Sequence, residues 1–81
     1  MRPDLAPLLW DTDPAHIDEE RDAVFLIVRV LTAGRPDHVA WMFRRYPRSL
    51  IESTVSGDRR LSERVAGAWA NLLGLQPPVS R

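Results

Sequence analysis

The segment from Ala23 to Ala33, AVFLIVRVLTA, is the strongest constraint on the fold of this chain. Most of its positions are apolar, so the rest of the molecule has to bury it on nearly every side. Its β-branched residues are compatible with a strand, but the length of the segment and the glycine that follows it favour a helix. We expect this central helix to begin at or near Asp18, with Glu19 and Glu20 in its first turn, beside the positive end of the helix dipole.

The residues from Arg59 to Leu75 carry a start signal, a helical period and a stop signal. Ser62 is placed to cap the helix through its hydroxyl, and Gly74 supplies the left-handed residue that usually ends one. Apolar residues at helical spacing predict a face that packs on the core, and they are Leu61, Val65, Ala68, Trp69, Leu72 and Leu73. The opposite face carries small residues that would allow close contact with another protein, namely Ala66, Gly67 and Ala70.

Two shorter helices are expected between these segments, one over residues 36–46 and one over residues 49–55. The sequence therefore predicts an all-α fold, a small bundle of three to four helices that resembles a helix-turn-helix and carries an extended N-terminal arm. We expect the arm to span residues 1–17, the single helical domain residues 18–75, and a loose tail residues 76–81. A chain of 81 residues buries only a modest core, which a partner could extend.

The net charge of zero hides an uneven distribution. Residues 1–22 hold seven acidic residues against two arginines, whereas residues 29–64 hold eight arginines against four acidic residues. Arg29 is the only charge inside the apolar segment, and its head must reach water or pair with an acid of the same chain. Only the placement of the charges is informative, because every basic residue is an arginine.

The arm contains a short apolar cluster in which Leu8, Leu9 and Trp10 follow one another. One interpretation is that these side chains pack on the protein's own core, because a terminus stays ordered only when it is tied down. The alternative is that they insert into a partner, since tryptophan is enriched at binding hot spots.

Asp11 and Asp13 have the Asp-x-Asp spacing that holds a divalent metal ion in some nucleotide-transferring enzymes. No glycine-rich phosphate loop and no suitably placed third carboxylate accompany them. Because Pro14 follows Asp13 directly, we favour a capping or turn role for Asp13 and expect neither a metal ion nor another cofactor.

Trp41 lies off the apolar stripe of its helix, so it either packs against a second element, which we favour, or serves as an exposed anchor. Arginines crowd the end of the same helix, where they complement the negative end of the dipole or contact an acidic or phosphate-bearing partner. We expect the residues that contact a partner to be Leu8, Leu9, Trp10, Asp11, Asp13, Trp41, Arg44, Arg45, Arg48 and Arg64.

No catalytic pattern is evident. His16 and His38 belong to no Ser-His-acid or His-x-x-x-His arrangement, and there are no cysteines to act as nucleophiles or zinc ligands. We therefore expect a binding protein rather than an enzyme, with no small-molecule substrate. No apolar run is long enough to cross a membrane, and the first residues lack a signal peptide, so the expected location is the cytoplasm.

The order LLWDTDPAHID, VLTAG, WMFRRYPRSLIESTV and RRLSERVAGAWANLLGL resembles a family of small, DUF6922-like bacterial proteins of unknown function. Such proteins are often encoded beside nucleotidyltransferase toxins of the abortive-infection (AbiEii) type and look like their antitoxins. The resemblance covers roughly residues 8–75. It implies an antitoxin of a type II toxin-antitoxin system, which binds and neutralises a nucleotidyltransferase that modifies an RNA such as tRNA. The acidic arm would face the basic substrate groove of that enzyme.

The alternative is a DNA-binding regulator of its own operon, built on the helix-turn-helix pattern. It is weaker, because the last helix has only Arg64 after its cap to contact phosphates or bases. At most, weak binding to operator DNA is expected beside the protein partner.

Overall fold

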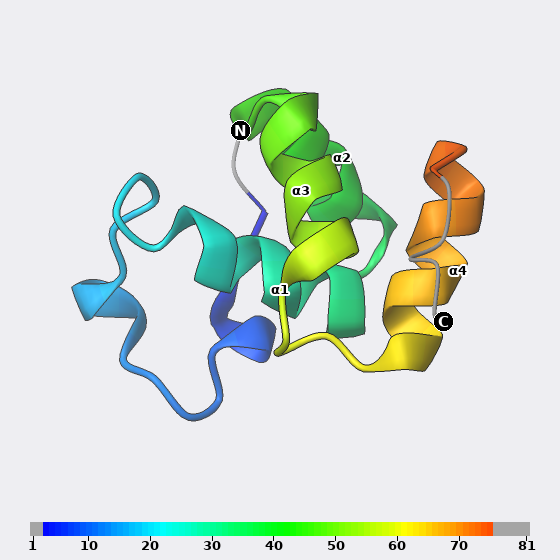
Figure 1. Cartoon of the computed structure of the whole chain (residues 1–81). Coiled ribbons are helices and arrows are strands. Elements are labelled where there is room, and N and C mark those ends of the chain that lie inside the picture. Colours follow the sequence, from blue (N-terminus) through cyan, green and yellow to red (C-terminus); the bar gives the residue numbers. More distant parts are fainter. Residues whose placement is uncertain (1–2, 76–81) are drawn as a thin grey trace.

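The computed structural model describes residues 3–75, which form four α-helices preceded by two short 3₁₀ turns (Figure 1). The 3₁₀ turns are η1 (Ala6–Leu8) and η2 (Pro14–His16). The helices are α1 (Ala23–Ala33), α2 (Pro36–Arg45), α3 (Arg48–Gly57) and α4 (Glu63–Leu73). No strand occurs in this part of the chain, so the predicted all-α fold of three to four helices is confirmed.

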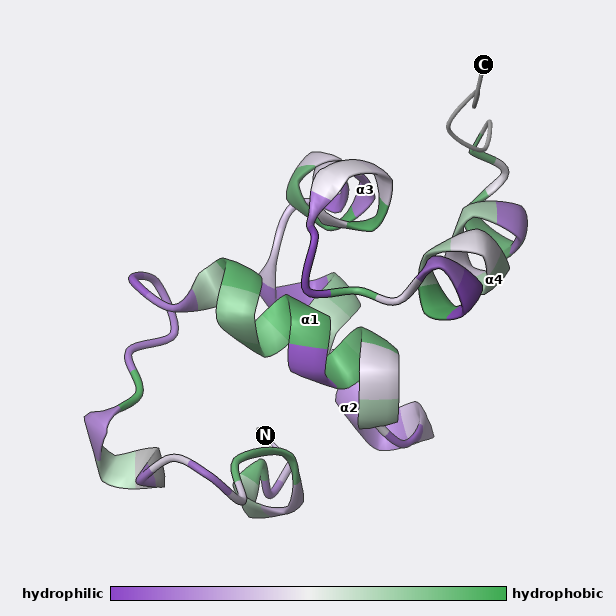
Figure 2. Cartoon of the chain, turned by 60° about the horizontal axis from the view of Figure 1, so that its bottom comes forward, coloured by the Kyte–Doolittle hydropathy of each residue, from purple (hydrophilic) through white to green (hydrophobic). Residues whose placement is uncertain are grey.

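Helix α1 is the centre of the molecule. It contacts α2, α3, α4 and η1, and Figure 2 shows that it is hydrophobic over most of its length. Leu26, Ile27 and Val30 are almost completely inaccessible to solvent. Met42 from α2 and Ile51 from α3 are buried in the same core. The predicted burial of the apolar segment is therefore confirmed for residues 26–28, 30 and 31, whereas residues 23–25 are only half-buried.

The prediction that this helix begins near Asp18 is wrong, because α1 begins only at Ala23. The Asp18 carboxylate accepts hydrogen bonds from the backbone N–H groups of Glu20 (2.8 Å) and Arg21 (2.9 Å). The Asp22 carboxylate in turn accepts from the backbone N–H of Asp18 at 3.0 Å. These bonds from side chain to backbone stabilise a turn that competes with helix formation. The two glutamates after Asp18 therefore do not stand in the first turn of a helix.

The predicted helix ends are confirmed at three positions. The Ser62 hydroxyl accepts from the backbone N–H of Val65 at 3.2 Å, and Gly74 ends α4 in the left-handed region at φ 72°. Gly34 ends α1 with an extended backbone instead. A Cβ atom at Gly34 would lie 2.6 Å from the Val30 carbonyl oxygen, so the close approach of the chain to α1 requires glycine there.

The predicted orientation of α4 is correct for Val65, Trp69 and Leu73, which pack against the core, but wrong for Ala68 and Leu72. Ala70 is buried and Ala66 is half-buried, whereas Ala68 and Leu72 are exposed, Leu72 at 75%. The Trp69 indole N–H donates to the Leu31 carbonyl oxygen at 2.9 Å and fixes the rotation of the helix on α1. Small residues therefore face the core, because they let α4 approach its neighbours closely.

The first turn of the arm, η1, lies against α1, and the chain then loops away from the helices through η2 before it enters α1 (Figure 1). This contact joins the predicted arm to the predicted domain, so the two form one packed unit. The loose tail predicted for residues 76–81 lies outside the described residues.

Candidate functional site

The arm is docked by its own leucines. Leu5, Leu8 and Leu9 are all buried in the same cluster as the core residues of α1. The interpretation that Leu8 and Leu9 pack on the protein's own core is therefore confirmed, and in this arrangement neither side chain is exposed to a partner. Their burial stabilises the arm because the apolar surface they cover on α1 would otherwise meet water.

Arg29 on α1 holds the end of this docked segment. Its Nη1 atom donates to the Leu8 carbonyl oxygen at 3.2 Å, and its Nη2 atom pairs with Asp11 Oδ2 at 2.8 Å. The guanidinium carbon also lies 4.4 Å from the centre of the Trp10 ring and 4.7 Å from that of Phe25. The prediction that Arg29 pairs with an acid of the same chain is confirmed, and the acid is Asp11.

The hydrogen bond from Arg29 lowers the pKa of the Asp11 carboxyl below its usual range. An ionised Asp11 keeps the arginine in place, and the arginine in turn supports the indole ring. Trp10 is nevertheless 69% exposed. The structure thus presents one large aromatic side chain to solvent in a fixed position, on the arm where the sequence placed a partner anchor.

A surface pocket of about 280 Å³ lies beside this ring. Its lining comes from the arm, α1 and the α3–α4 connection, and consists of Trp10, Phe25, Val28, Arg29, Thr32 and Arg60. Four of these residues follow the spacing i, i+3, i+4 and i+7 along α1, so they share one helix face. That spacing was visible in the sequence, but the apolar character of the segment concealed it. The contribution of Arg60 was not visible, because it depends on the path of the connection.

The other acidic residues of the arm have local roles. The Asp13 carboxylate accepts from the backbone N–H of Ala15 at 3.0 Å, as the predicted turn role requires. Glu19 forms an ion pair with Arg45 at 2.9 Å, between the arm and the end of α2. Four carboxylates of the arm and of the turn that follows it make no ion pair with an arginine within residues 3–75, and they are Asp4, Asp13, Asp18 and Glu20.

The predicted anchor Trp41 is buried against the edge of Tyr46, with ring centres 5.7 Å apart. The packing interpretation is therefore correct, and Trp41 cannot reach a partner. The Tyr46 hydroxyl donates to the Glu19 carbonyl oxygen at 2.8 Å, and burial raises the pKa of Tyr46 to about 12. This pair is part of the attachment of the arm to α2.

The predicted arginine contacts fall into two groups. Arg45 pairs with Glu19, and Arg48 pairs with Glu52 at 2.7 Å and donates to the Leu73 carbonyl oxygen at 3.2 Å. Arg44 and Arg64 are exposed and make no hydrogen bond or ion pair with the described residues. None of these four arginines lines the pocket beside Trp10 or stacks on its ring.

The two histidines are not placed as a catalytic pair. His16 is exposed and lies 3.6 Å from an Asp13 carboxylate oxygen. His38 is 1% exposed, and its Nδ1 atom accepts from the backbone N–H of Arg35 at 3.0 Å. Its Nε2 atom therefore carries the proton and donates to the Asp4 carbonyl oxygen at 2.8 Å. This second fastening of the arm was not predicted, because nothing local in the sequence connects His38 with Asp4.

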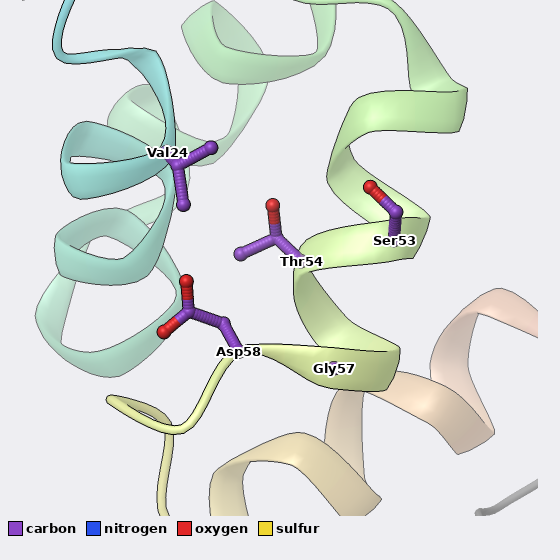
Figure 3. A pocket seen from close by; sticks show the side chains of 5 residues that line it. All are labelled: Val24, Ser53, Thr54, Gly57 and Asp58. Atoms are coloured by element: carbon purple, nitrogen blue, oxygen red, sulfur yellow. The ribbon is translucent and has the colours of Figure 1, made fainter.

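A second pocket, also of about 280 Å³, lies between α1 and the end of α3. Figure 3 shows Val24, Thr54 and Asp58 facing a common space there, but their polar groups are already engaged. The Thr54 hydroxyl donates to the Leu50 carbonyl oxygen at 2.8 Å, and Asp58 binds Arg60. Arg60 holds the pKa of Asp58 at about 2, so this carboxylate is no proton acceptor at neutral pH.

Within residues 3–75, no group of three or more His, Cys, Asp or Glu side chains is arranged to hold a metal ion. None of the described helices combines the length and the apolar character that crossing a bilayer requires.

Comparison with known proteins gives one match. The model of a family described as a family of unknown function, DUF6922, matches residues 5–55, which cover most of the arm, α1, α2 and most of α3. No curated protein and no solved structure matches the chain. The matched region contains Trp10, Asp11 and Arg29, but it excludes α4.

Proposed function

Since the chain belongs to DUF6922, a family whose function is unknown, we propose its role from its own surface and motifs. The proposed role is that of an antitoxin of a type II toxin-antitoxin system, which binds and neutralises a nucleotidyltransferase toxin by protein-protein contact. The resemblance of its motifs to proteins encoded beside such toxins supports this role.

The observation that carries the proposal is the exposed Trp10 ring, which Arg29 and Asp11 hold in one position. Binding of a large aromatic side chain costs free energy when the side chain must be ordered, and the contact of Trp10 with Arg29 lowers that cost. Tryptophan is also the residue type most enriched among those that dominate binding energy. A fixed and exposed tryptophan is therefore better suited to a protein interface than to solvent.

The charge of the arm supports the same choice of partner. Asp4, Asp13, Asp18 and Glu20 are exposed, and none of them forms an ion pair with an arginine of the described residues. An enzyme that handles RNA and nucleotides has a basic substrate groove, which attracts an acidic surface and speeds association. Trp10 would then anchor a complex that these carboxylates steer.

Co-expression with a nucleotidyltransferase of the abortive-infection type, followed by co-purification, tests the proposal. The wild-type chain should co-purify with the enzyme and abolish its transfer of nucleotides to RNA. Trp10→Ala should weaken the complex by about 30-fold or more, because hot-spot residues contribute about 2 kcal/mol or more.

Leu72→Ala is the matched control, since Leu72 is the other large exposed apolar side chain among residues 3–75 and lies on α4. It should leave the affinity within a few-fold of wild type. Equal effects of the two substitutions would contradict a specific anchor at Trp10. A wild-type chain that does not bind the enzyme would refute the proposed function itself.

The alternative, a helix-turn-helix regulator, is a weaker proposal. The exposed residues of α4 include Glu63, Arg64, Asn71 and Leu72, of which only Arg64 is basic. A recognition helix ordinarily presents several basic or amide side chains to phosphates and base edges. A mobility shift on operon DNA that weakens steeply with salt would favour this alternative over the antitoxin.

A further inference from the structure

The pocket beside Trp10 joins three separate parts of the chain. Trp10 comes from the arm, Phe25 and Arg29 come from α1, and Arg60 comes from the connection between α3 and α4. The pocket exists only while the arm is docked. A ligand that fills it therefore contacts both the anchor and the helical body.

The polar groups on the pocket wall are hydrogen-bond donors. The polar side chains among the lining residues are Trp10, Arg29, Arg60 and Thr32, which carry N–H or O–H donors; the hydroxyl of Thr32 can also accept, and the two arginines are paired with Asp11 and Asp58. No carboxylate lines the pocket, and the rest of the wall is aromatic or aliphatic. A matching ligand has an apolar stem and a terminal group that accepts hydrogen bonds.

Arg60 has an unused edge. Its Nε atom donates to Asp58 Oδ1 at 3.0 Å, and its Nη2 atom donates to Asp58 Oδ2 at 2.8 Å. Its Nη1 atom makes no hydrogen bond to any residue within 3–75. An arginine held by one carboxylate on its Nε edge still offers the two N–H groups of its other edge, which fit a second carboxylate in a bidentate manner.

Arg29 differs from Arg60 because both of its terminal nitrogens are already hydrogen-bonded within the chain. Its two terminal nitrogens already bind the Leu8 carbonyl oxygen and Asp11, so it supports the aromatic wall instead of receiving a ligand. Arg60 is thus the one guanidinium of the pocket with an edge left for an anion.

The size of the pocket selects the kind of ligand. About 280 Å³ is slightly below the range of about 300–1,000 Å³ that pockets for free small molecules occupy. A single side chain of a protein partner fits this space and remains attached to a larger interface. The donors on the wall then specify which side chain it is.

We infer that this pocket receives a glutamate or aspartate side chain of the protein partner, with its carboxylate on the free edge of Arg60 and its stem against the apolar part of the pocket lining. This inference rests on the proposed function and adds the chemistry of one contact. It predicts that the partner's surface places a carboxylate next to the position that Trp10 occupies.

The pocket can be probed without the partner. The ¹⁵N-labelled chain is titrated with 3-phenylpropionate, which carries a carboxylate on an apolar stem, and followed through its indole and arginine Nε–H signals. We expect a saturable shift of the Trp10 indole signal with a Kd of about 1 mM, as suits one isolated side chain. The neutral analogue 3-phenylpropanol should bind at least tenfold more weakly.

Arg60→Gln should weaken binding of 3-phenylpropionate at least tenfold, whereas Arg44→Gln, which removes an exposed and unpaired arginine elsewhere, should not change it. Arg60→Lys keeps the charge without the two-pronged edge and should give an intermediate loss. Helical circular dichroism confirms that each variant is folded. Equal binding of the neutral analogue, an unchanged Kd in Arg60→Gln, or tighter binding of inorganic phosphate would overturn the inference.

The same variants separate this inference from the proposed function. If the wild-type chain binds the nucleotidyltransferase and Arg60→Gln binds it equally well, the carboxylate contact is wrong and the antitoxin role stands. If the wild-type chain binds 3-phenylpropionate at the pocket but not the enzyme, the role is wrong and the chemistry of the pocket stands.

Discussion

The two ends of the described chain pack on α1 in contrasting ways. The arm has little regular secondary structure, yet it buries Leu5, Leu8 and Leu9. Helix α4 is regular and well capped, yet Ala70 is the only buried residue within it. The regularity of a segment therefore does not indicate how strongly it is attached to the core.

The polar contacts of the two ends are more alike. The arm is fastened by donors to the Asp4 and Leu8 carbonyl oxygens, and α4 is fastened by Trp69 to the Leu31 carbonyl oxygen and through its own Leu73 carbonyl oxygen. The difference in stability between the ends should thus come from the buried leucines. Four substitutions test this comparison.

Leu8→Ala should have the largest effect. Removal of a fully buried leucine lowers the free energy of unfolding by about 2–5 kcal/mol, since it removes apolar contacts and leaves a cavity. Leu72→Ala on α4 should change it by less than about 0.5 kcal/mol, because Leu72 is exposed. Urea unfolding followed by circular dichroism measures both. A small effect of Leu8→Ala would mean that the arm is not part of the core.

Ala70→Leu should have the second largest effect on the free energy of unfolding. Ala70 is the buried small residue through which α4 approaches its neighbours, so a larger side chain displaces the helix and costs about 1–3 kcal/mol. Ala68→Leu, on the exposed side of the same helix, is the control and should be nearly neutral. If thermal unfolding instead shows that Ala68→Leu is the more destabilising of the two, the orientation of α4 predicted from the apolar spacing would be correct.

Arg29→Met should cost about 1–2 kcal/mol, because the variant keeps the apolar stem but loses the bond to Leu8 and the pair with Asp11. The Trp10 ring also loses its support. Acrylamide quenching of tryptophan fluorescence and urea unfolding report the two effects. Arg44→Met, which loses no bond to the described residues, should match wild type in both measurements.

The smallest effect concerns pH. The pKa of Asp11 is lowered in the folded state, so its ion pair stabilises the fold at neutral pH. That contribution disappears as the pH falls below the ordinary value for aspartate, about 4. The difference in stability between wild type and Asp11→Asn should therefore shrink from pH 7 to pH 3. Asp58, whose folded pKa is about 2, should lose its contribution to the free energy of unfolding between pH 4 and pH 2. A difference in stability between wild type and variant that does not change with pH would contradict the ion pair concerned.

Local signals in the sequence predicted the helix ends but not the contacts between helices. Ser62 and Gly74 act on their own neighbouring backbone, so their roles follow from their positions. The rotation of α4 depends on Trp69 reaching Leu31, which are far apart in the chain. Apolar spacing alone predicted that Leu72 would be buried, whereas in the structure the smaller Ala70 is buried because it allows close packing of α4.

In the candidate site, too, the sequence indicated local features but not the contacts between distant residues. The sequence indicated that Arg29 needs an acidic partner and that Trp10 could be an anchor. It could not choose between burial and exposure for Leu8, Leu9 and Trp10, which are adjacent residues of similar character. The direction of each side chain depends on how the arm turns back on α1, and that turn is set by distant groups such as His38.

The bridge made by His38 also gives the protein an internal reporter. His16 is open to solvent, whereas the His38 ring is enclosed and bonded at both nitrogens. An acylating reagent specific for imidazoles should therefore modify His16 at once and His38 only in molecules whose arm has detached. The ratio of the two labels, read by mass spectrometry, measures how often the arm opens, and binding of a partner to the docked arm should protect His38 further.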